Sequence, residues 1–247
     1  MRWLLVGLLG LLIWCPVAAD ETTPTPVTAG APTSITEDAV KLLDQGKVYL
    51  GLNNPEFAAK PQQLDPDTRN GDGDKALRTF QSLVKRFPQY ADGWMWLGLA
   101  LTETLQCSKE HPEGVPQLTE SRIADGLAAF EKAYNTNPGN LTYVCCYSDA
   151  LMTLRKDFDT TRKLWDRYLP TATSDVNRVT ALVQAGRACL NKAYFGKSAT
   201  MPADEVKQYY QAAATYVKQA AHLLPKSDSV KEMQELLRQY RKPLTGK

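Results

Sequence analysis

The chain has 247 residues, of which 43% are hydrophobic, and its formal net charge is +2. This composition supplies enough apolar surface for one or two folded domains. The near balance of 29 basic and 27 acidic residues gives no reason to expect a polyanion-binding surface, so no nucleic-acid partner is expected.

The first 19 residues have the three parts of a secretory signal peptide. Arg2 supplies the positive start, an apolar run spans residues 4–14, and small residues ending at Ala19 predict cleavage after that position. The run is too short for a retained anchor. A lipoprotein signal would need a small residue before Cys15, where the sequence has Trp14. The sequence therefore predicts an exported protein, periplasmic or secreted depending on the host, without stable membrane insertion after cleavage.

Residues 20–35 are rich in Thr, Pro and Ala and show no apolar period, which is typical of a flexible linker. An apolar helical face containing Val40 and Leu43 follows, and residues 53–73 then have the prolines, glycines and polar residues of an irregular insertion. The acidic run 65–75 invites comparison with a calcium-binding loop. Neither possible register satisfies that motif, so we interpret the run as a turn that caps the next helix.

The stretch from Asp74 to Leu105 carries two helical faces separated by Pro88. A residue that precedes a proline is disfavoured in the helical region, so the first helix should end near Phe87. Gly98 lies inside the second helix at a cost of about 1 kcal/mol relative to Ala, which makes sense if another helix crosses closely there. The first face consists of Ala76, Phe80, Leu83 and Val84, and the second of Trp94, Leu97 and Leu101.

This arrangement, A-x3-F-x7-P followed by W-x2-L-G-x2-L, resembles the tetratricopeptide repeat, a helix–turn–helix unit of about 34 residues. Phe80 recurs as Phe130, 50 residues later. The excess of about 16 residues over one period coincides with the loop-like segment 106–120. The next equivalent, Leu164, follows Phe130 by 34 residues without an insertion.

The resemblance implies an all-α fold, namely a right-handed α-solenoid of about four repeats in a domain from residue 36 to 240. The third repeat has the weakest signature because Ser148 replaces the usual small Gly or Ala, and residues 193–204 have the composition of a further insertion. The repeats are expected near 36–88, 91–138, 141–172 and 179–225, followed by a capping helix at 228–240 and a basic tail at 241–247.

Four of the five cysteines would remain after cleavage and would be exposed to an oxidising compartment. Structural disulfides are favoured on this ground, with buried free thiols as the alternative. First helices of neighbouring tetratricopeptide repeats run side by side, so we expect Cys189 to bond to Cys145 or Cys146. A bond between these two adjacent cysteines would strain a helix. The fourth cysteine, Cys107, lies at the edge of the second insertion.

Motifs for catalysis or metal binding are scarce. The two histidines, His111 and His222, do not complete the paired ligand spacings of a zinc site, and no hydrolase, metalloprotease or phosphate-loop motif occurs. We therefore expect no enzyme, metal or cofactor. An enzyme built on the insertion loops would have to use the cluster around Glu110, His111 and Glu113. Asn140 begins an N-glycosylation sequon, or simply caps the next helix.

The function expected is protein binding, because tetratricopeptide repeats bind partners through the concave surface formed by their first helices. A mixture of Met, Leu and charged residues suits an extended peptide or a partner helix. An exported interaction scaffold is the first hypothesis, and a structural subunit of an envelope assembly is the alternative. The resemblance places in the groove Asp92, Met95, Leu99 and Thr102 in the second repeat, Thr142, Cys145, Asp149 and Met152 in the third, and Arg187, Asn191 and Lys192 in the fourth.

Overall fold

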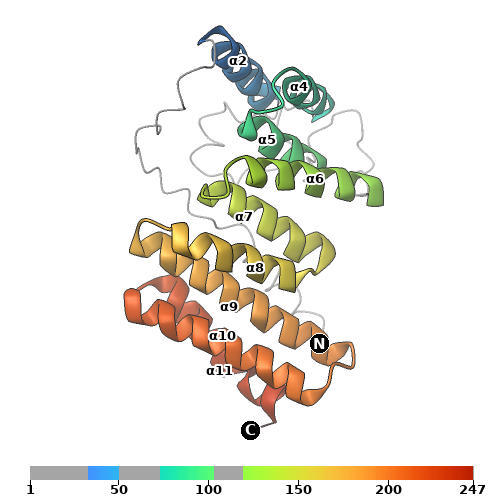
Figure 1. Cartoon of the computed structure of the whole chain (residues 1–247). Coiled ribbons are helices and arrows are strands. Elements are labelled where there is room, and N and C mark those ends of the chain that lie inside the picture. Colours follow the sequence, from blue (N-terminus) through green and yellow to red (C-terminus); the bar gives the residue numbers. More distant parts are fainter. Residues whose placement is uncertain (1–32, 50–72, 103–118, 247) are drawn as a thin grey trace. The chain divides into compact units, whose positions relative to one another are not determined.

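The computed structural model describes residues 33–49, 73–102 and 119–246, and all regular secondary structure within these ranges is helical (Figure 1). The all-α fold class is therefore confirmed for the described part of the chain. The helices are α2 (Thr33–Tyr49), α4 (Gly73–Arg86), α5 (Ala91–Thr102), α6 (Glu120–Thr136), α7 (Leu141–Ala150), the π-helix η2 (Leu151–Arg155), α8 (Phe158–Tyr168), the 3-10 helix η3 (Leu169–Thr171), α9 (Asp175–Ser198), α10 (Ala203–Leu223) and α11 (Asp228–Thr245).

Several sequence predictions lie outside the described residues. They include the signal peptide, most of the linker, and most of the two insertions between α2 and α4 and between α5 and α6. Cys107 and the cluster of Glu110, His111 and Glu113 fall in the second of these segments.

The chain divides into two compact units between Asn137 and Pro138. In the first unit α2 packs on α4, α4 on α5, and α5 on α6. The predicted apolar face of α4 is buried: Phe80 and Leu83 are inaccessible to solvent and pack with Leu43 and Leu97 from the neighbouring helices. Burying such side chains contributes roughly 1.5–3 kcal/mol each, which explains why these short helices hold together.

Two glycines allow close helix crossings in the first unit. A Cβ atom on Gly46 of α2 would overlap the Phe80 ring of α4, and one on Gly98 of α5 would lie 2.7 Å from Cδ1 of Phe130 on α6. In both cases the glycine precedes an insertion and the phenylalanine follows it. The close crossing predicted at Gly98 is confirmed, and the same contact is made twice.

Four-residue turns of one kind join α4 to α5, α6 to α7, and α10 to α11. Each turn has a proline at its second position, namely Pro88, Pro138 and Pro225, and each preceding helix ends two residues earlier. This agrees with the exclusion of the pre-proline residue from the helix. In the first turn the Trp94 indole nitrogen donates a hydrogen bond of 2.7 Å to the Pro88 carbonyl, which fastens the turn to α5.

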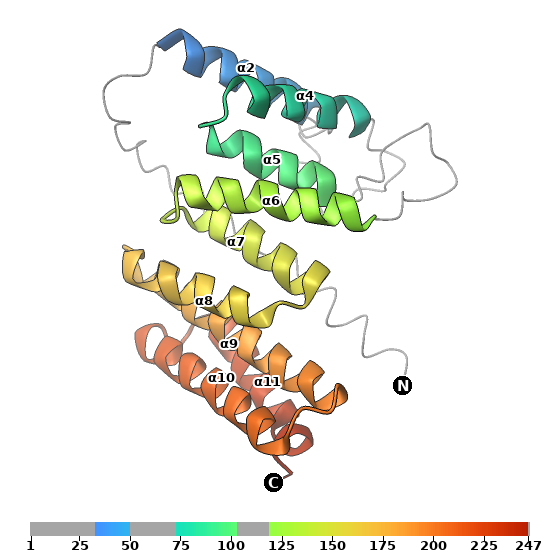
Figure 2. The ribbon, with the colours of Figure 1, turned by 45° about the vertical axis from the view of Figure 1, so that its right-hand side comes forward.

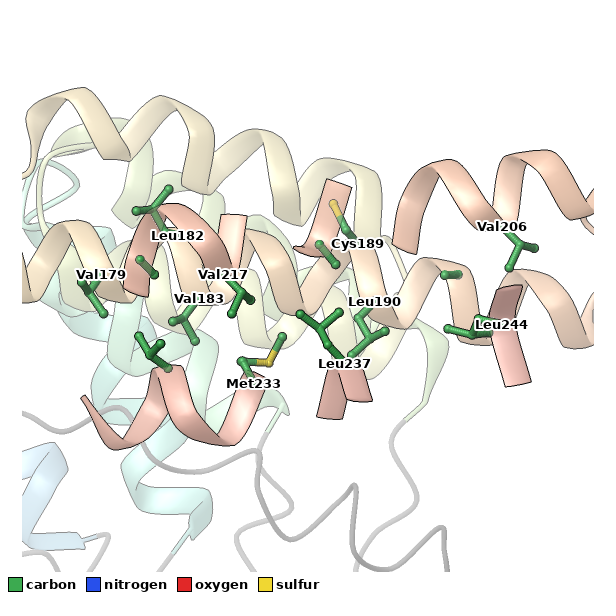
Figure 3. Packing of buried hydrophobic residues seen from close by; sticks show 14 residues of the cluster. Val179, Leu182, Val183, Cys189, Leu190, Val206, Val217, Met233, Leu237 and Leu244 are labelled. Atoms are coloured by element: carbon green, nitrogen blue, oxygen red, sulfur yellow. The ribbon is translucent and has the colours of Figure 1, made fainter. Parts of the chain in front are cut away.

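The second unit is arranged around α9, which packs against α8, α10 and α11 (Figures 1 and 2). The buried cluster in Figure 3 joins the last three helices of the chain, with Val183 and Leu190 from α9, Val217 from α10, and Met233 and Leu237 from α11. As predicted, α8 also contributes core side chains, because Leu164, Trp165 and Tyr168 are buried.

Two boundaries differ from the sequence prediction. Helix α9 continues to Ser198 through the first half of the expected insertion, because Ala193 is fully buried and Gly196 leaves room for Met201. Helix α11 continues to Thr245, so most of the expected basic tail is helical, and Leu244 is buried in the core of the second unit. In both places an apolar contact extends a helix that the local composition would have ended.

Candidate functional site

Four of the predicted groove residues come together in the second unit. Asp149 on α7 lies within electrostatic reach of Arg187 on α9, and Nδ2 of Asn191 lies 3.9 Å from Sδ of Met152 in η2. Arg187 and Asn191 are four residues apart on α9 and therefore share one face. All four residues are among the positions that the sequence analysis assigned to the groove.

Local structure explains how α7 and η2 present Asp149 and Met152. The Asn140 side-chain carbonyl accepts hydrogen bonds from the amides of Thr142 (2.9 Å) and Tyr143 (3.4 Å), so it caps α7 as expected. The helix then widens into η2, a π-helix of a kind found frequently at functional sites. It ends at Lys156, which has a left-handed backbone with φ of 56°.

The electrostatic environment of Asp149 is unusual. Burial raises the pKa of this carboxyl group from its ordinary value of 3.8 to about 7, although the Arg187 guanidinium acts in the opposite direction. Desolvation disfavours the charged form of a carboxyl group, and here it outweighs the nearby positive charge. The group therefore changes charge near neutral pH, where a proton, a cation or a hydrogen-bond donor from a partner can compete for it.

Not every predicted groove residue offers free surface. Met152 is only 3% exposed and packs with Phe158 and Ala188, and Met95 in α5 of the first unit is also buried. Of the other α5 positions, Asp92, Leu99 and Thr102 are half-buried, and the Thr102 hydroxyl donates to the Gly98 carbonyl. Thr142 at the start of α7 is exposed.

Lys192 belongs to a different network from Arg187. Its ammonium forms a 2.9 Å ion pair with Asp159 on α8 and lies 5.8 Å from the ring centre of Tyr209 on α10. Five residues of α-helix correspond to a rotation of about 140°, so Lys192 faces away from the side that carries Arg187. The structure thus separates Lys192 from the other two predicted positions on α9.

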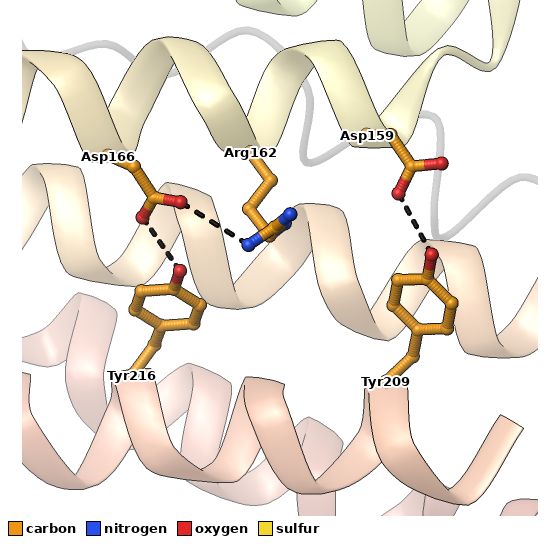
Figure 4. A network of polar contacts seen from close by, with 5 residues as sticks. All are labelled: Asp159, Arg162, Asp166, Tyr209 and Tyr216. Carbon is orange, nitrogen blue, oxygen red and sulfur yellow. Dashed lines mark hydrogen bonds and ion pairs between the residues drawn. The ribbon is translucent and has the colours of Figure 1, made fainter. Parts of the chain in front are cut away.

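Sequence reasoning missed a row of polar contacts that connects α8 to α10 (Figure 4). The Tyr209 hydroxyl donates to Asp159 at 3.0 Å, and the Tyr216 hydroxyl donates to Asp166 at 2.6 Å. Arg162 also contacts Asp166, at 3.4 Å. Both the two aspartates and the two tyrosines are seven residues apart, and this matched spacing was the available signal.

The predicted disulfide of Cys189 with Cys145 or Cys146 is wrong. Cys189 is a free, buried thiol, and none of the three described cysteines belongs to a disulfide. Helix α8 packs against both α7 and α9, and the charged side chains that act on Cys189 are those of Arg162, Asp166 and Asp159 on α8. Burial raises the pKa of Cys189 to about 12, so it remains a protonated core residue rather than a reactive thiolate.

Two buried hydroxyl groups, those of Ser148 and Thr161, make polar contacts within and between α7 and α8. Ser148, at the position of the usual Gly or Ala, is fully buried and its hydroxyl donates to the Cys145 carbonyl at 3.0 Å. The buried Thr161 hydroxyl of α8 lies 2.8 Å from the Asp157 carbonyl and 3.5 Å from that of Ser148. A small hydroxyl residue that bonds its own helix can thus replace an apolar one.

Two further features concern the described residues alone. They contain no group of three or more His, Cys, Asp or Glu side chains arranged to hold a metal ion. None of their helices is long and apolar enough to cross a membrane.

No protein-family model matches the chain, and no curated protein matches it either. The tetratricopeptide resemblance therefore rests on the sequence pattern alone.

Proposed function

We propose that this protein is an exported helical-repeat scaffold of the tetratricopeptide type, which binds a peptide or a partner protein in the groove of a right-handed α-solenoid. Two features support the repeat assignment. The contact between a first-helix glycine and a second-helix phenylalanine recurs as Gly46–Phe80 and Gly98–Phe130, and turns with a proline at the second position recur after α4, α6 and α10. The recurrence of Phe80 as Phe130 exceeds one family period of about 34 residues by about the length of the insertion between α5 and α6.

The observation that carries the binding proposal is the position of the buried Asp149 carboxyl group within electrostatic reach of Arg187. Within the described residues the Asp149 carboxylate forms no ion pair, and its raised pKa indicates that the fold does not fully satisfy its charge. A partially desolvated acid beside a guanidinium offers an acceptor and a donor to the amides of an extended peptide. Purely structural surface charges would instead be solvated or paired on their own helix, as Asp175 and Arg178 are at 3.3 Å.

The test compares two charge-neutral double variants of the full-length protein expressed in its own host. Asp149→Asn with Arg187→Gln removes the groove pair, and Asp175→Asn with Arg178→Gln removes the exposed pair on α9 as a matched control. We expect chemical cross-linking followed by mass spectrometry of the exported fraction to recover a partner with the wild type and the control, and to lose it with the groove variant. Equal recovery by both variants, with unchanged circular dichroism, would overturn the groove proposal.

Export has a separate test. We expect the mature protein to begin at Asp20, which an intact-mass measurement of the exported form would show directly. A mass that includes residues 1–19 would contradict the predicted processing.

A further inference from the structure

A shallow, open cavity of about 370 Å³ lies in the second unit. It lies where the turn between η2 and α8 meets the C-terminal turns of α9 and the start of α10. Cavities that bind small molecules begin at about 300 Å³, so this one suits a compact ligand. The side chains that define it are Lys156, Phe158, Lys192, Phe195, Met201 and Glu205.

One wall of the cavity is apolar and partly open. The rings of Phe158 and Phe195 are stacked, with centres 5.5 Å apart and planes inclined by 13°. Phe158 is buried, whereas the Phe195 side chain is 37% exposed, which is high for a phenylalanine in a helix that packs in the second unit. Met201 continues this wall because Gly196 makes room for it: a Cβ atom there would lie 2.7 Å from the Met201 sulfur.

Lys156 supplies a cation at the edge of this wall. Its ammonium donates to the Thr153 carbonyl at 3.1 Å and lies 5.5 Å from the centre of the Phe195 ring. An ammonium has three donors, and within the described part of the chain Lys156 has no acidic partner for the remaining two. Lys192, in contrast, is neutralised by Asp159. The cavity therefore holds an exposed lysine that forms no ion pair with the described residues, and the Glu205 carboxylate also belongs to its lining.

The backbone around the cavity is held in an unfavourable conformation. Lys156 and Thr200, with φ of 56° and 70°, are the two non-glycine residues of the described chain with positive φ, and both line this cavity. Such a conformation costs roughly 1–2 kcal/mol, and more for a β-branched residue such as Thr200. Strain of this kind is concentrated at ligand-binding sites, which agrees with the unusual side-chain environment.

The geometry points to a binding site for a small aromatic carboxylate, whose ring contacts Phe195 and Met201 and whose carboxylate accepts hydrogen bonds from Lys156. Two sources share this chemistry. A free aromatic amino acid also has an ammonium group, which the Glu205 carboxylate in the lining can receive. The C-terminal residue of a peptide has the same ring and carboxylate without the ammonium. The site is independent of the proposed groove function.

The test titrates the full mature chain with three probes and follows the amide signals of α8–α10 by NMR. The probes are phenylalanine, N-acetylphenylalanine and N-acetylphenylalaninamide. Loss of the charged hydrogen bond to Lys156 should make the amide probe at least about tenfold weaker than N-acetylphenylalanine. Absence of shifts with every probe at millimolar concentration, or equal affinity for the last two, would overturn the proposal.

Variants then assign the contacts and separate the two sources. Lys156→Gln should weaken both carboxylate probes by about tenfold, while Lys218→Gln, at an exposed lysine of α10, serves as the matched control and should have no effect. Glu205→Gln should weaken phenylalanine and leave N-acetylphenylalanine unchanged if the ligand is a free amino acid. If the wild type binds N-acetylphenylalanine more tightly than phenylalanine, the ligand is the C-terminal residue of a peptide. Carboxylate binding that Lys156→Gln leaves intact rejects the site.

Discussion

At the scale of single residues, Asp149 makes the stability of the protein depend on pH. In the unfolded chain this carboxyl group loses its proton near pH 4, whereas in the folded chain its pKa is about 7. Between these values the folded state binds more protons, so stability falls as the pH rises and the loss is complete above pH 7. We expect Asp149→Asn to remove this loss.

The effect of Asp149→Asn should be visible in thermal melts at two pH values. One pKa unit corresponds to about 1.4 kcal/mol, and partial exposure reduces the total to an effect on the order of 2 kcal/mol. The melting temperature of the variant should therefore be several degrees above that of the wild type at pH 8. At pH 4 the two melting temperatures should be equal. Asp175→Asn, at an exposed carboxylate, is the control, and a pH profile of Asp149→Asn that parallels the wild type would contradict the expectation.

Gly98 gives a second prediction at this scale. A methyl group at this position would lie 2.7 Å from the Phe130 ring, and Phe130 is itself 2% exposed and unable to move aside. Gly98→Ala should thus destabilise the first unit by about 1–3 kcal/mol, despite the better helix propensity of alanine. The check is a denaturant double-mutant cycle with Phe130→Leu. Destabilisations that simply add would show that the ring is not the obstacle.

Single residues also show how far the sequence could predict the site. Gly98 could be assigned a close helix crossing because a glycine inside a helix is costly and requires a reason. Asn140 could be assigned a cap from its position before a helix. The shifted pKa of Asp149 could not be foreseen, because it depends on how much water the packed helices exclude. The different side of α9 that Lys192 faces could have been foreseen from its spacing of five residues to Arg187, whereas its ion pair with Asp159 could not.

At the scale of helices, the α8–α10 contacts support a prediction about Tyr216. Burial and the hydrogen bond to Asp166 raise the pKa of Tyr216 to about 12, so its hydroxyl stays a donor at physiological pH. Tyr216→Phe should cost about 1–2 kcal/mol, because it removes a partner of a half-buried carboxylate. Tyr209→Phe should cost less stability, since Asp159 retains its ion pair with Lys192. Urea unfolding measures both.

Tyr240→Phe is the control for the loss of a tyrosine hydroxyl. Tyr240 packs edge-on against Tyr194, with ring centres 5.3 Å apart, and this contact does not use its oxygen. We expect Tyr240→Phe to leave the free energy of unfolding nearly unchanged. A cost at Tyr240 equal to that at Tyr216 would show that the hydrogen bond to Asp166 contributes nothing specific.

Helix boundaries could be predicted where the sequence contains a local stop signal and not where packing decides. Prolines 88, 138 and 225 ended their helices at the expected place. The buried side chains of Ala193 and Leu244 extend α9 and α11 beyond their expected ends into segments whose composition resembles loops, and α11 then ends at Gly246, which has a left-handed backbone with φ of 73°. The disulfide prediction failed because packing also decides which side chains a buried cysteine meets: Cys189 stays a free thiol, and the charged side chains that act on it belong to α8.

At the scale of the whole molecule, each unit has a core of its own. The buried cluster of the first unit is built from α2, α4, α5 and α6, and the largest cluster of the second from α9, α10 and α11. The proposed repeat architecture implies that stability is approximately a sum of local terms and nearest-neighbour terms, so a lesion in one core should act mainly on its own unit.

This expectation is tested by hydrogen exchange and mass spectrometry on Leu83→Ala and Leu237→Ala. Both leucines are buried, and each truncation should cost about 2–5 kcal/mol. Leu83→Ala should speed exchange in α4–α6 and leave α8–α11 protected, and Leu237→Ala should do the reverse. Each variant is the control for the other, because both remove the same side chain. Loss of protection throughout the chain in both variants would mean that the units unfold together, and the local sum would then be the wrong description of this protein.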